Sequence, residues 1–277
     1  MAGPRALDTG TDQLLATLDD GVAVLTLNRP EVRNALGDTV SPALRRTLAL
    51  LRDEPDARCV VVTGAGRAFC SGGDVKGMGS RTPPREDAPP SLEEVVADQA
   101  ERQRALTGAL YALPVPTIAA LPGPAAGAGL AIALACDLRI AAESAFVTTG
   151  FANVGLSGDY GLSFFLSQLV GTAVARELFF TAERVDAASC ERLGIVNRVV
   201  PDEQLMDETL SLARRLARGP TRAYARMKAN LDRALREELP ACLLAEAEGT
   251  VETAQTEDHR EAVRAFVEKR APRFKGR

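Results

Sequence analysis

Residues 60–74 have the sequence Val60-Val-Val-Thr-Gly-Ala-Gly-Arg-Ala-Phe-Cys-Ser-Gly-Gly-Asp74, in which an apolar run enters a glycine-rich turn. A later stretch has the same design: Thr117-Ile-Ala-Ala-Leu-Pro-Gly-Pro-Ala-Ala-Gly-Ala-Gly129. Each apolar run predicts a buried strand. Glycine lets a ligand approach the backbone closely, and the free N–H groups of such a turn favour a developing negative charge. The two turns therefore indicate an α/β fold with an anion-stabilising site, although the glycines of either turn alone could equally serve tight packing.

The second turn also begins a dinucleotide-binding pattern, because Gly127-Ala128-Gly129 opens a GxGxxG motif. However, Ile132 stands in the place of the third glycine. The turn also lies deep in the chain, whereas the dinucleotide motif opens a βαβ unit near its start. We therefore expect no nucleotide redox cofactor here.

Size, charge and cysteine content indicate an ordinary globular chain. It has 277 residues, of which 46% are hydrophobic, and a net charge of −4. This lacks the basic excess that would indicate a nucleic-acid partner. The five cysteines are odd in number and show no CxxC spacing. We therefore expect neither a disulfide framework nor a metal site, and a cytoplasmic protein.

One uncharged stretch, from residue 105 to 136, is a candidate for a membrane span. Prolines interrupt it at positions 114, 116, 122 and 124, and they prevent one continuous helix of about 20 residues. A buried strand, a turn and a buried helix explain the stretch better, so no membrane association is expected.

Local patterns in the first half predict a hairpin and a capped helix. Two β-rich runs, 14–18 and 22–27, flank a turn. Ser91 with Glu94 forms a capping box that begins a helix to about residue 113. Before it, residues 77–90 are rich in Pro, Ser, Arg and Gly, which predicts a mobile loop.

After Tyr160 the pattern is mostly helical, with candidate helices that include 161–169 and 172–181. We therefore expect an α/β body over residues 1–200 and a helical C-terminal region over residues 201–277.

Several segments together resemble the crotonase (enoyl-CoA hydratase/isomerase) family. The matching segments are 27–36 (Leu-Asn-Arg-Pro-Glu-Val-Arg-Asn-Ala-Leu), 63–75, 119–137, 187–201 and 256–270. They follow one another in the family's order from about residue 12 to the C-terminus. The resemblance implies a spiral core of ββα units that holds the acyl-CoA site, followed by a helical trimerisation region. It further implies a homotrimer or dimer of trimers, an acyl-CoA thioester as substrate, and no cofactor, since coenzyme A is part of the substrate.

The resemblance also implies an oxyanion hole made by the peptide N–H groups of Gly73 and Ala128. Such donors stabilise the enolate that forms when a proton leaves the carbon beside the thioester carbonyl. Ala128 stands where the family often has glycine. A backbone donor needs no particular side chain, so the expected function depends on the geometry of the turn.

Two departures from the family's pattern bear on the reaction. A hydratase of this family uses two glutamates, and the matching positions here are Ala131 and Phe151. Neither replacement can transfer a proton.

One acid remains nearby, Asp159, which matches the aspartate of members that resemble the phenylacetate-pathway enoyl-CoA isomerase. A buried carboxylate beside an apolar acyl chain should have a raised pKa, which suits a proton shuttle. The alternative is that Asp159 is a helix N-cap, a position that favours Asp. We predict Asp159 as the acid/base of a double-bond isomerisation. Enoyl-CoA hydratase and a catalytically inactive acyl-CoA-binding protein are the alternatives.

The remaining candidates have less specific roles. As substrate-binding residues the match implies Arg33, Ser71, Gly72, Asp74, Phe266 and Lys269. Arg33 could instead be an ordinary surface residue, and Asp74 and Asp137 a structural cap or a buried partner. Phe266 and Lys269, one helical turn apart, could reach a neighbouring subunit's ligand, or they could be a core Phe and a solvated Lys. We expect His259 to be exposed and Cys70 to serve packing.

Overall fold

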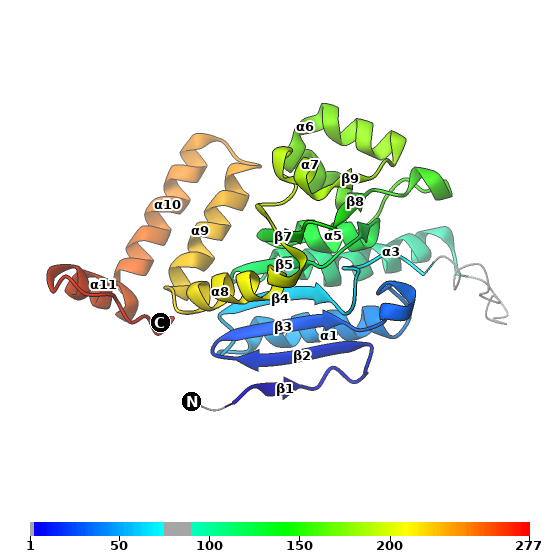
Figure 1. The fold of residues 1–277 in the computed structure, drawn as a ribbon. Helices are drawn as coiled ribbons and strands as arrows, with labels where there is room; N and C mark the ends of the chain where they lie inside the picture. The colour runs from blue at the N-terminus through cyan, green and yellow to red at the C-terminus, as the bar shows by residue number, and fades with distance from the viewer. Residues whose placement is uncertain (1–2, 75–89) are drawn as a thin grey trace.

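The computed structural model describes residues 3–74 and 90–277, and within these residues seven strands form one sheet in the order β1-β2-β3-β4-β5-β7-β10 (Figure 1). The strands are β1 (Arg5–Leu7), β2 (Leu14–Asp19), β3 (Val22–Leu27), β4 (Cys59–Gly64), β5 (Thr117–Leu121), β7 (Leu138–Ala142) and β10 (Arg198–Val200). The first three strands pair antiparallel, and the pairs from β3 to β10 are parallel. The predicted hairpin is confirmed as β2 and β3.

Strand β4 shows why the apolar run at 59–63 forms the centre of the sheet. Every residue of β4 is buried. Val60 and Val62 pack into one core cluster, whereas Cys59 and Val61 pack into a second cluster on the other face. Successive side chains of a strand point to opposite faces, so a continuous apolar run is required where helices cover both faces of a parallel sheet.

Different helices cover the two faces. The first cluster includes apolar residues of α1 (Val40–Asp53) and α5 (Ala128–Ala135), and the second includes Leu205, Ala213 and Ala217 of α8 (Leu205–Ala217). Thus α8, which follows the expected boundary at residue 200, packs on the sheet as part of the body.

A smaller three-stranded sheet holds the second glycine turn. It consists of β6 (Ala125–Ala126), β8 (Phe146–Thr148) and β9 (Val185–Asp186), with β8 between the other two. Isolated bridges join Cys70 to Ala125 and Leu36 to Gly73, so the two glycine-rich segments of the sequence lie side by side.

The capping box is confirmed at the start of α3 (Leu92–Gln103), where Ser91 and Glu94 exchange both hydrogen bonds. A single π-helical turn (Arg104–Gly108) and α4 (Ala109–Tyr111) continue the helix, in agreement with its predicted extent. The loop predicted at residues 77–90 falls, apart from Pro90, outside the described residues.

The helices predicted at 161–169 and 172–181 are confirmed as α6 (Leu162–Thr181), which has non-helical dihedral angles at Gly171. Further helices are α7 (Ala187–Arg192), α9 (Thr221–Ala234), α10 (Leu239–Ala254), α11 (Glu257–Val267) and the short 3-10 turns Pro30–Val32, Ala152–Val154 and Asp202–Gln204.

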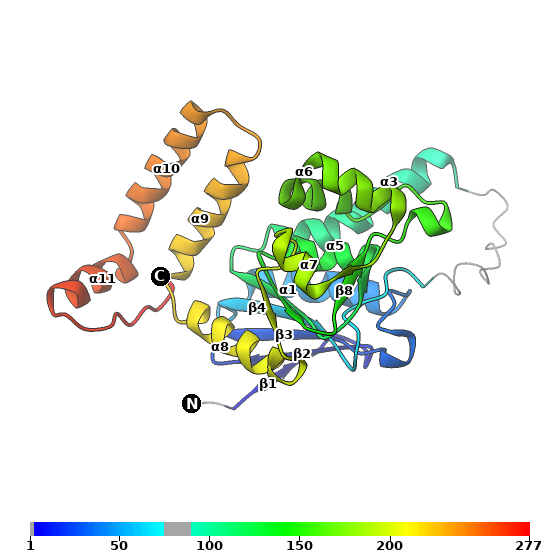
Figure 2. The same cartoon turned by 45° about the horizontal axis from the view of Figure 1, so that its top comes forward.

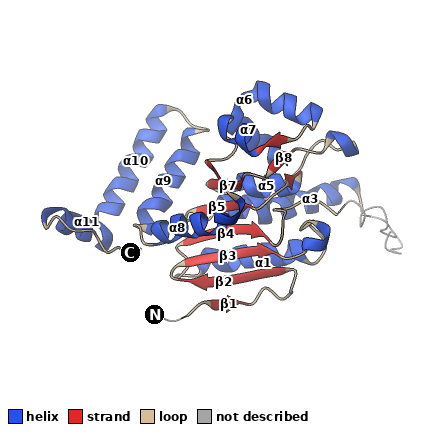
Figure 3. Ribbon diagram, viewed as in Figure 1, coloured by secondary structure: helices blue, strands red, loops and turns tan. Residues whose placement is uncertain are grey.

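Helices α9 to α11 extend away from the sheet, as both ribbon views show (Figures 1 and 2). Colouring by secondary structure shows that this region carries helices and loops but no strand among the described residues (Figure 3). Among those same residues, no helix has the length and apolar character that a membrane crossing requires.

Candidate active site

A cavity of about 630 Å³ brings together three residues that the sequence singles out, Gly73, Ala128 and Asp159. It lies between the start of α1, helix α3 and the segment before α6. Its full lining is Leu36, Gly37, Asp38, Ser41, Pro42, Arg45, Gly73, Asp98, Gln99, Glu101, Arg102, Ala105, Ala128, Asp159 and Tyr160. Residues more than 80 positions apart in sequence therefore line one site.

Ala128 is the first residue of α5, and its amide has no partner within that helix, as is usual for a first turn. The preceding Gly127 has φ 51° and ψ −125°, a conformation that side chains disfavour. Glycine at 127 thus sets the direction in which the Ala128 N–H points.

A β-bridge between Leu36 and Gly73 sets the orientation of the Gly73 amide. The Leu36 N–H donates to the Gly72 carbonyl at 2.7 Å, and the Asp74 N–H donates to the Leu36 carbonyl at 3.0 Å. Gly73 itself therefore faces the other side of this segment. Within the described chain, neither its amide nor that of Ala128 donates one of the backbone hydrogen bonds outside the regular elements.

Two glycines allow the two turns to touch. A Cβ atom at Gly129 would lie 2.3 Å from the Cys70 carbonyl oxygen, and one at Gly72 would lie 2.8 Å from the Ala126 carbonyl oxygen. Gly72 also has φ 89°, in the left-handed region. Both distances are shorter than real Cβ contacts, so larger residues would separate the two candidate donors.

Asp159 lies in a turn between the 3-10 turn at Ala152–Val154 and α6. Gly158, Tyr160 and Gly161 around it all have positive φ. The N-cap interpretation of Asp159 is wrong, because the cap residue of α6 is Gly161 and no side chain caps that helix. The left-handed conformations of Tyr160 and Gly161 keep the aspartate outside the helix.

The Asp159 carboxyl is half-buried and loses part of its hydration. Its Oδ1 atom is buried and has no hydrogen-bond partner within residues 3–74 and 90–277. Burial raises the pKa of Asp159 from 3.8 to about 6. A carboxyl that titrates near neutral pH can both accept and return a proton.

Gln103 and Tyr160 hold this turn against helix α3. The Gln103 side-chain oxygen accepts a hydrogen bond from the Tyr160 N–H at 2.8 Å. Tyr160 has φ 51°, a conformation that costs a residue with a side chain roughly 1–2 kcal/mol. The hydrogen bond that Gln103 of α3 accepts from Tyr160 helps to offset this cost, so Gln103 supports the position of Asp159.

The two positions matching the family's glutamates are apolar and buried. Ala131 lies within α5 and is fully buried. The Phe151 ring stacks on Phe179 with 6.4 Å between centroids. The same ring lies within 3.8 Å of where a Cβ atom would stand at Gly127 and at Gly158. An aromatic ring therefore lies between the turn at Gly127 and the Asp159 turn, where the family's second glutamate would be.

Three other candidates, Ser71, Arg33 and Asp74, lie close to the first glycine-rich turn. The Ser71 hydroxyl donates to the Val32 carbonyl at 3.3 Å, and the Ser71 N–H donates to the carbonyl of Arg33, whose side chain is exposed. Asp74 forms an ion pair with Arg29 at 3.5 Å, which agrees with a structural role. Within the described residues, none of these three side chains lines the cavity.

Phe266 and Lys269, near the C-terminus, lie away from the cavity. Phe266 on α11 is 86% exposed, so the core interpretation of this residue is wrong. Lys269 follows α11 with φ 53°. Helix α11 is at the opposite end of the molecule from α3 (Figure 1), so neither residue reaches the cavity of its own chain.

The predictions for His259 and Cys70 are confirmed. His259 is exposed. Cys70 is buried, and burial raises the pKa of its thiol to about 12, which excludes a thiolate at neutral pH.

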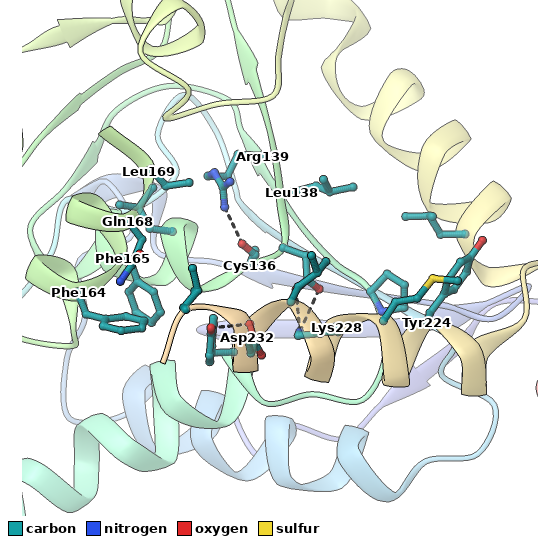
Figure 4. A pocket seen from close by; sticks show the side chains of 18 residues that line it. Cys136, Leu138, Arg139, Phe164, Phe165, Gln168, Leu169, Tyr224, Lys228 and Asp232 are labelled. Carbon is teal, nitrogen blue, oxygen red and sulfur yellow. Dashed lines mark hydrogen bonds and ion pairs between the residues drawn. The ribbon is translucent and has the colours of Figure 1, made fainter. Parts of the chain in front are cut away.

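A second cavity, of about 540 Å³, lies between α9 and the body. Figure 4 shows Lys228 and Asp232 of α9 on one wall, with Phe164 and Phe165 of α6 opposite. Lys228 forms an ion pair with Asp137 at 2.9 Å, and Thr117 donates two further hydrogen bonds to Asp137. The structural interpretation of Asp137 is therefore confirmed. The lining of this cavity includes none of the predicted catalytic residues, so the first cavity is the candidate active site.

Comparison with known proteins agrees with this geometry, because residues 17–277 match the enoyl-CoA hydratase/isomerase family. The chain belongs to that family. A Rhodobacter capsulatus protein named a probable enoyl-CoA hydratase is 40% identical over 94% of this chain and 96% of its own length. The 1,2-epoxyphenylacetyl-CoA isomerase of Escherichia coli is 35% identical over 95% of this chain and 98% of its own length.

Solved structures of the same family have the same fold. An enoyl-CoA hydratase from Polaromonas sp. JS666 superposes with a TM-score of 0.85 at 34% identity and covers 95% of this chain and 99% of that one. The crotonase fold expected from the sequence is thus confirmed for this family member.

Sequence reasoning missed Gln103, Tyr160, Arg45 and Arg102. Tyr160 could have been found as the neighbour of Asp159. Gln103, Arg45 and Arg102 belong to helices α3 and α1. The apolar periodicity of a helix predicts its buried face, but it does not predict which polar side chain contacts a turn far away in the sequence.

The raised pKa of Asp159 predicts how the stability of the fold depends on pH. The folded protein retains this proton up to about pH 6, while the unfolded chain releases it near 3.8. Stability is therefore lost as pH rises through this window, and above it the folded state carries a poorly solvated charge. Asp159→Asn should remove a penalty of about 1 kcal/mol, reduced for partial exposure, and raise the melting temperature at pH 7.5 by about 2–4 °C.

The same variant should match the wild type at pH 4, and the measurement is thermal unfolding across pH 4–8. Asp186→Asn is the control. Hydrogen bonds from Ser189 lower the pKa of Asp186, so the folded protein favours the charged form of this carboxyl. An Asp159→Asn protein that is less stable than wild type at pH 7.5 would contradict the assigned desolvation.

Proposed function

We propose that this enzyme is an enoyl-CoA isomerase, in which Asp159 moves a proton between two carbons of the acyl chain. The observation that carries the proposal is the half-buried carboxyl of Asp159, which lines one cavity with Gly73 and Ala128 and whose buried Oδ1 atom has no hydrogen-bond partner among the described residues. The amides of Gly73 and Ala128 would form the oxyanion hole. The 35% identity to an epoxyphenylacetyl-CoA isomerase is consistent with isomerase chemistry.

The proposed reaction balances with one acid/base. In a 3-enoyl-CoA, the Asp159 carboxylate takes a proton from the carbon beside the thioester carbonyl. The electrons move into a dienolate, whose oxygen accepts hydrogen bonds from the Gly73 and Ala128 amides. Asp159 then returns the proton to the carbon at the far end of the conjugated system, which yields the 2-enoyl-CoA. A pKa of about 6 leaves Asp159 mostly ionised at pH 7 and still basic.

Hydration is the second candidate, and the relative named a probable enoyl-CoA hydratase favours it. Hydration needs a positioned water and a proton source. The apolar Ala131 and Phe151 occupy the matching positions, so Asp159 would have to serve both steps. A protein that only binds acyl-CoA is the third candidate.

Incubation with 2-enoyl-CoA and 3-enoyl-CoA in deuterated water separates these candidates. The isomerase predicts a shifted double bond with label, the hydratase a 3-hydroxyacyl-CoA, and the binding protein neither. Asp159→Asn should lower isomerase turnover by roughly 10²–10⁴, the usual contribution of a general acid/base, with acyl-CoA binding retained. Asp98→Asn, a change to an exposed, ion-paired carboxylate of the same cavity, should keep turnover within a few-fold.

A folded, substrate-binding Asp159→Asn protein with wild-type turnover would remove Asp159 from the mechanism. Accumulation of 3-hydroxyacyl-CoA by the wild type would establish the hydratase instead.

We also propose that the chain assembles as a homotrimer or a dimer of trimers through α9 to α11. Apolar side chains on α10 and α11 are more than half exposed in the single chain: Leu239, Leu243, Leu244, Val251, Phe266 and Val267. Their burial against another copy would remove apolar area from water. In such an assembly Phe266 and Lys269 would be available to a neighbour's ligand. Light scattering should give three or six chain masses, and a monomer would contradict the proposal.

A further inference from the structure

The cavity has a charged wall opposite the glycine turns. Helix α1 contributes Arg45, and α3 contributes Asp98, Glu101 and Arg102. Asp38, before α1, also lines the cavity. A site that took only a plain hydrocarbon chain would be expected to present mostly apolar side chains here.

Most of these charges are already compensated. Asp98 pairs with Arg102 at 2.7 Å, and Glu101 pairs with Arg104 at 2.6 Å. Asp38 is exposed and has a partner of its own. The exception is Arg45, a half-buried residue for which no hydrogen bond or ion pair occurs within residues 3–74 and 90–277.

The sequence of α1 directs Arg45 into the cavity. Val40, Leu44 and Leu48 are buried in the core. Arg45 follows Ser41 by four residues, so both lie on one edge of the helix, and both line the cavity. The next residue, Arg46, is exposed and points elsewhere, with its guanidinium 3.4 Å from the Thr9 carbonyl oxygen.

Tyr160 adds a hydroxyl group near the two cavity arginines. Burial is the main cause of the raised pKa of Tyr160, the Asp159 charge raises it further, and the charges of Arg45 and Arg102 act in the opposite direction. The phenol is therefore within electrostatic reach of both guanidinium groups and remains protonated at neutral pH. A protonated phenol is a hydrogen-bond donor.

We propose that the acyl group bound in this cavity ends in a carboxylate, which Arg45 pairs with and the Tyr160 hydroxyl helps to bind. The substrate class would be the monothioesters of dicarboxylic acids with coenzyme A. This inference rests on the proposed acyl-CoA function, and it adds the chemistry of the far end of the acyl chain.

The physical reason is the cost of a half-buried cation without a counter-ion. Such a charge loses part of its hydration and gains nothing in return. A carboxylate restores the balance, because the guanidinium fork matches its two oxygens and charge-assisted hydrogen bonds are stronger than neutral ones. A terminal methyl group at the same place would leave the guanidinium unpaired.

Binding calorimetry with saturated acyl-CoA thioesters, which cannot undergo the proposed isomerisation, tests the inference. Each pair differs only in a terminal carboxylate or methyl group: glutaryl-CoA against pentanoyl-CoA, adipoyl-CoA against hexanoyl-CoA, and suberoyl-CoA against octanoyl-CoA. The wild type should bind the carboxylate member of at least one pair roughly 10-fold more tightly. Arg45→Met should abolish this preference. The affinity for the acyl-CoA that ends in a methyl group should stay unchanged or improve. Arg46→Met, one residue along the same helix, should keep the preference.

The outcomes separate the two proposals. Equal affinities in every pair, or a preference that survives in Arg45→Met, would overturn the carboxylate site and leave the acyl-CoA function standing. Failure of the wild type to bind any ester would overturn both. Free coenzyme A should bind wild type and Arg45→Met equally, and an equal loss for free and acylated coenzyme A would show that Arg45 binds the phosphates instead. The wild-type comparison alone decides the matter if Arg45→Met does not fold.

Discussion

Backbone contact between residues 70–73 and the start of α5 sets the position of both candidate oxyanion donors. The contact exists because Gly72 and Gly129 have no Cβ atoms, which would stand 2.8 Å and 2.3 Å from carbonyl oxygens of the facing segment. The bridges Cys70–Ala125 and Leu36–Gly73 then fix the register. Parallel pairing of β3, β4 and β5 brings the ends of these strands to one edge of the sheet, where the turns follow. The fold thus supplies preorganised N–H groups, which need no rearrangement when charge develops.

The proposed acid/base depends on a second constraint, which is the apolar surroundings of the Asp159 turn. Phe151 packs against the sites of Gly127 and Gly158 and stacks on Phe179, so it fills the space beside both turns. The buried Oδ1 atom of Asp159, which has no hydrogen-bond partner among residues 3–74 and 90–277, destabilises the fold locally, and the Gln103–Tyr160 hydrogen bond offsets part of this cost. Such locally unfavourable groups persist where function requires them. The same cavity is lined by Arg45, which has no ion pair among the described residues. The proposed chemistry at one end of the acyl chain and the proposed recognition at the other would therefore share one cavity.

The sequence predicted what local patterns and the family motifs determine. The apolar run of β4 and the Ser91–Glu94 capping box depend on neighbours within a few residues, and both were predicted correctly. The raised pKa of Asp159 was predicted correctly, although the residue is half-buried rather than fully buried. The N-cap alternative failed because α6 begins at Leu162 with Gly161 as its cap residue, and Tyr160 and Gly161 both have positive φ. Arg45 and Gln103 were not predicted, since their roles arise where α1 and α3 meet a turn more than 50 residues away. Phe266 gave no local sign that its helix leaves it exposed.

The central claim is that one desolvated carboxyl, held beside two backbone donors, is the acid/base of this site. The most direct test is a carbon-13 NMR titration of the aspartate side-chain carboxyls, with the Asp159 resonance assigned by its loss in Asp159→Asn. We expect a midpoint of about 6 for Asp159 in the folded enzyme. A midpoint at the ordinary aspartate value of about 4 would contradict it, because the carboxyl would then be solvated and too weak a base for the proposed proton transfer.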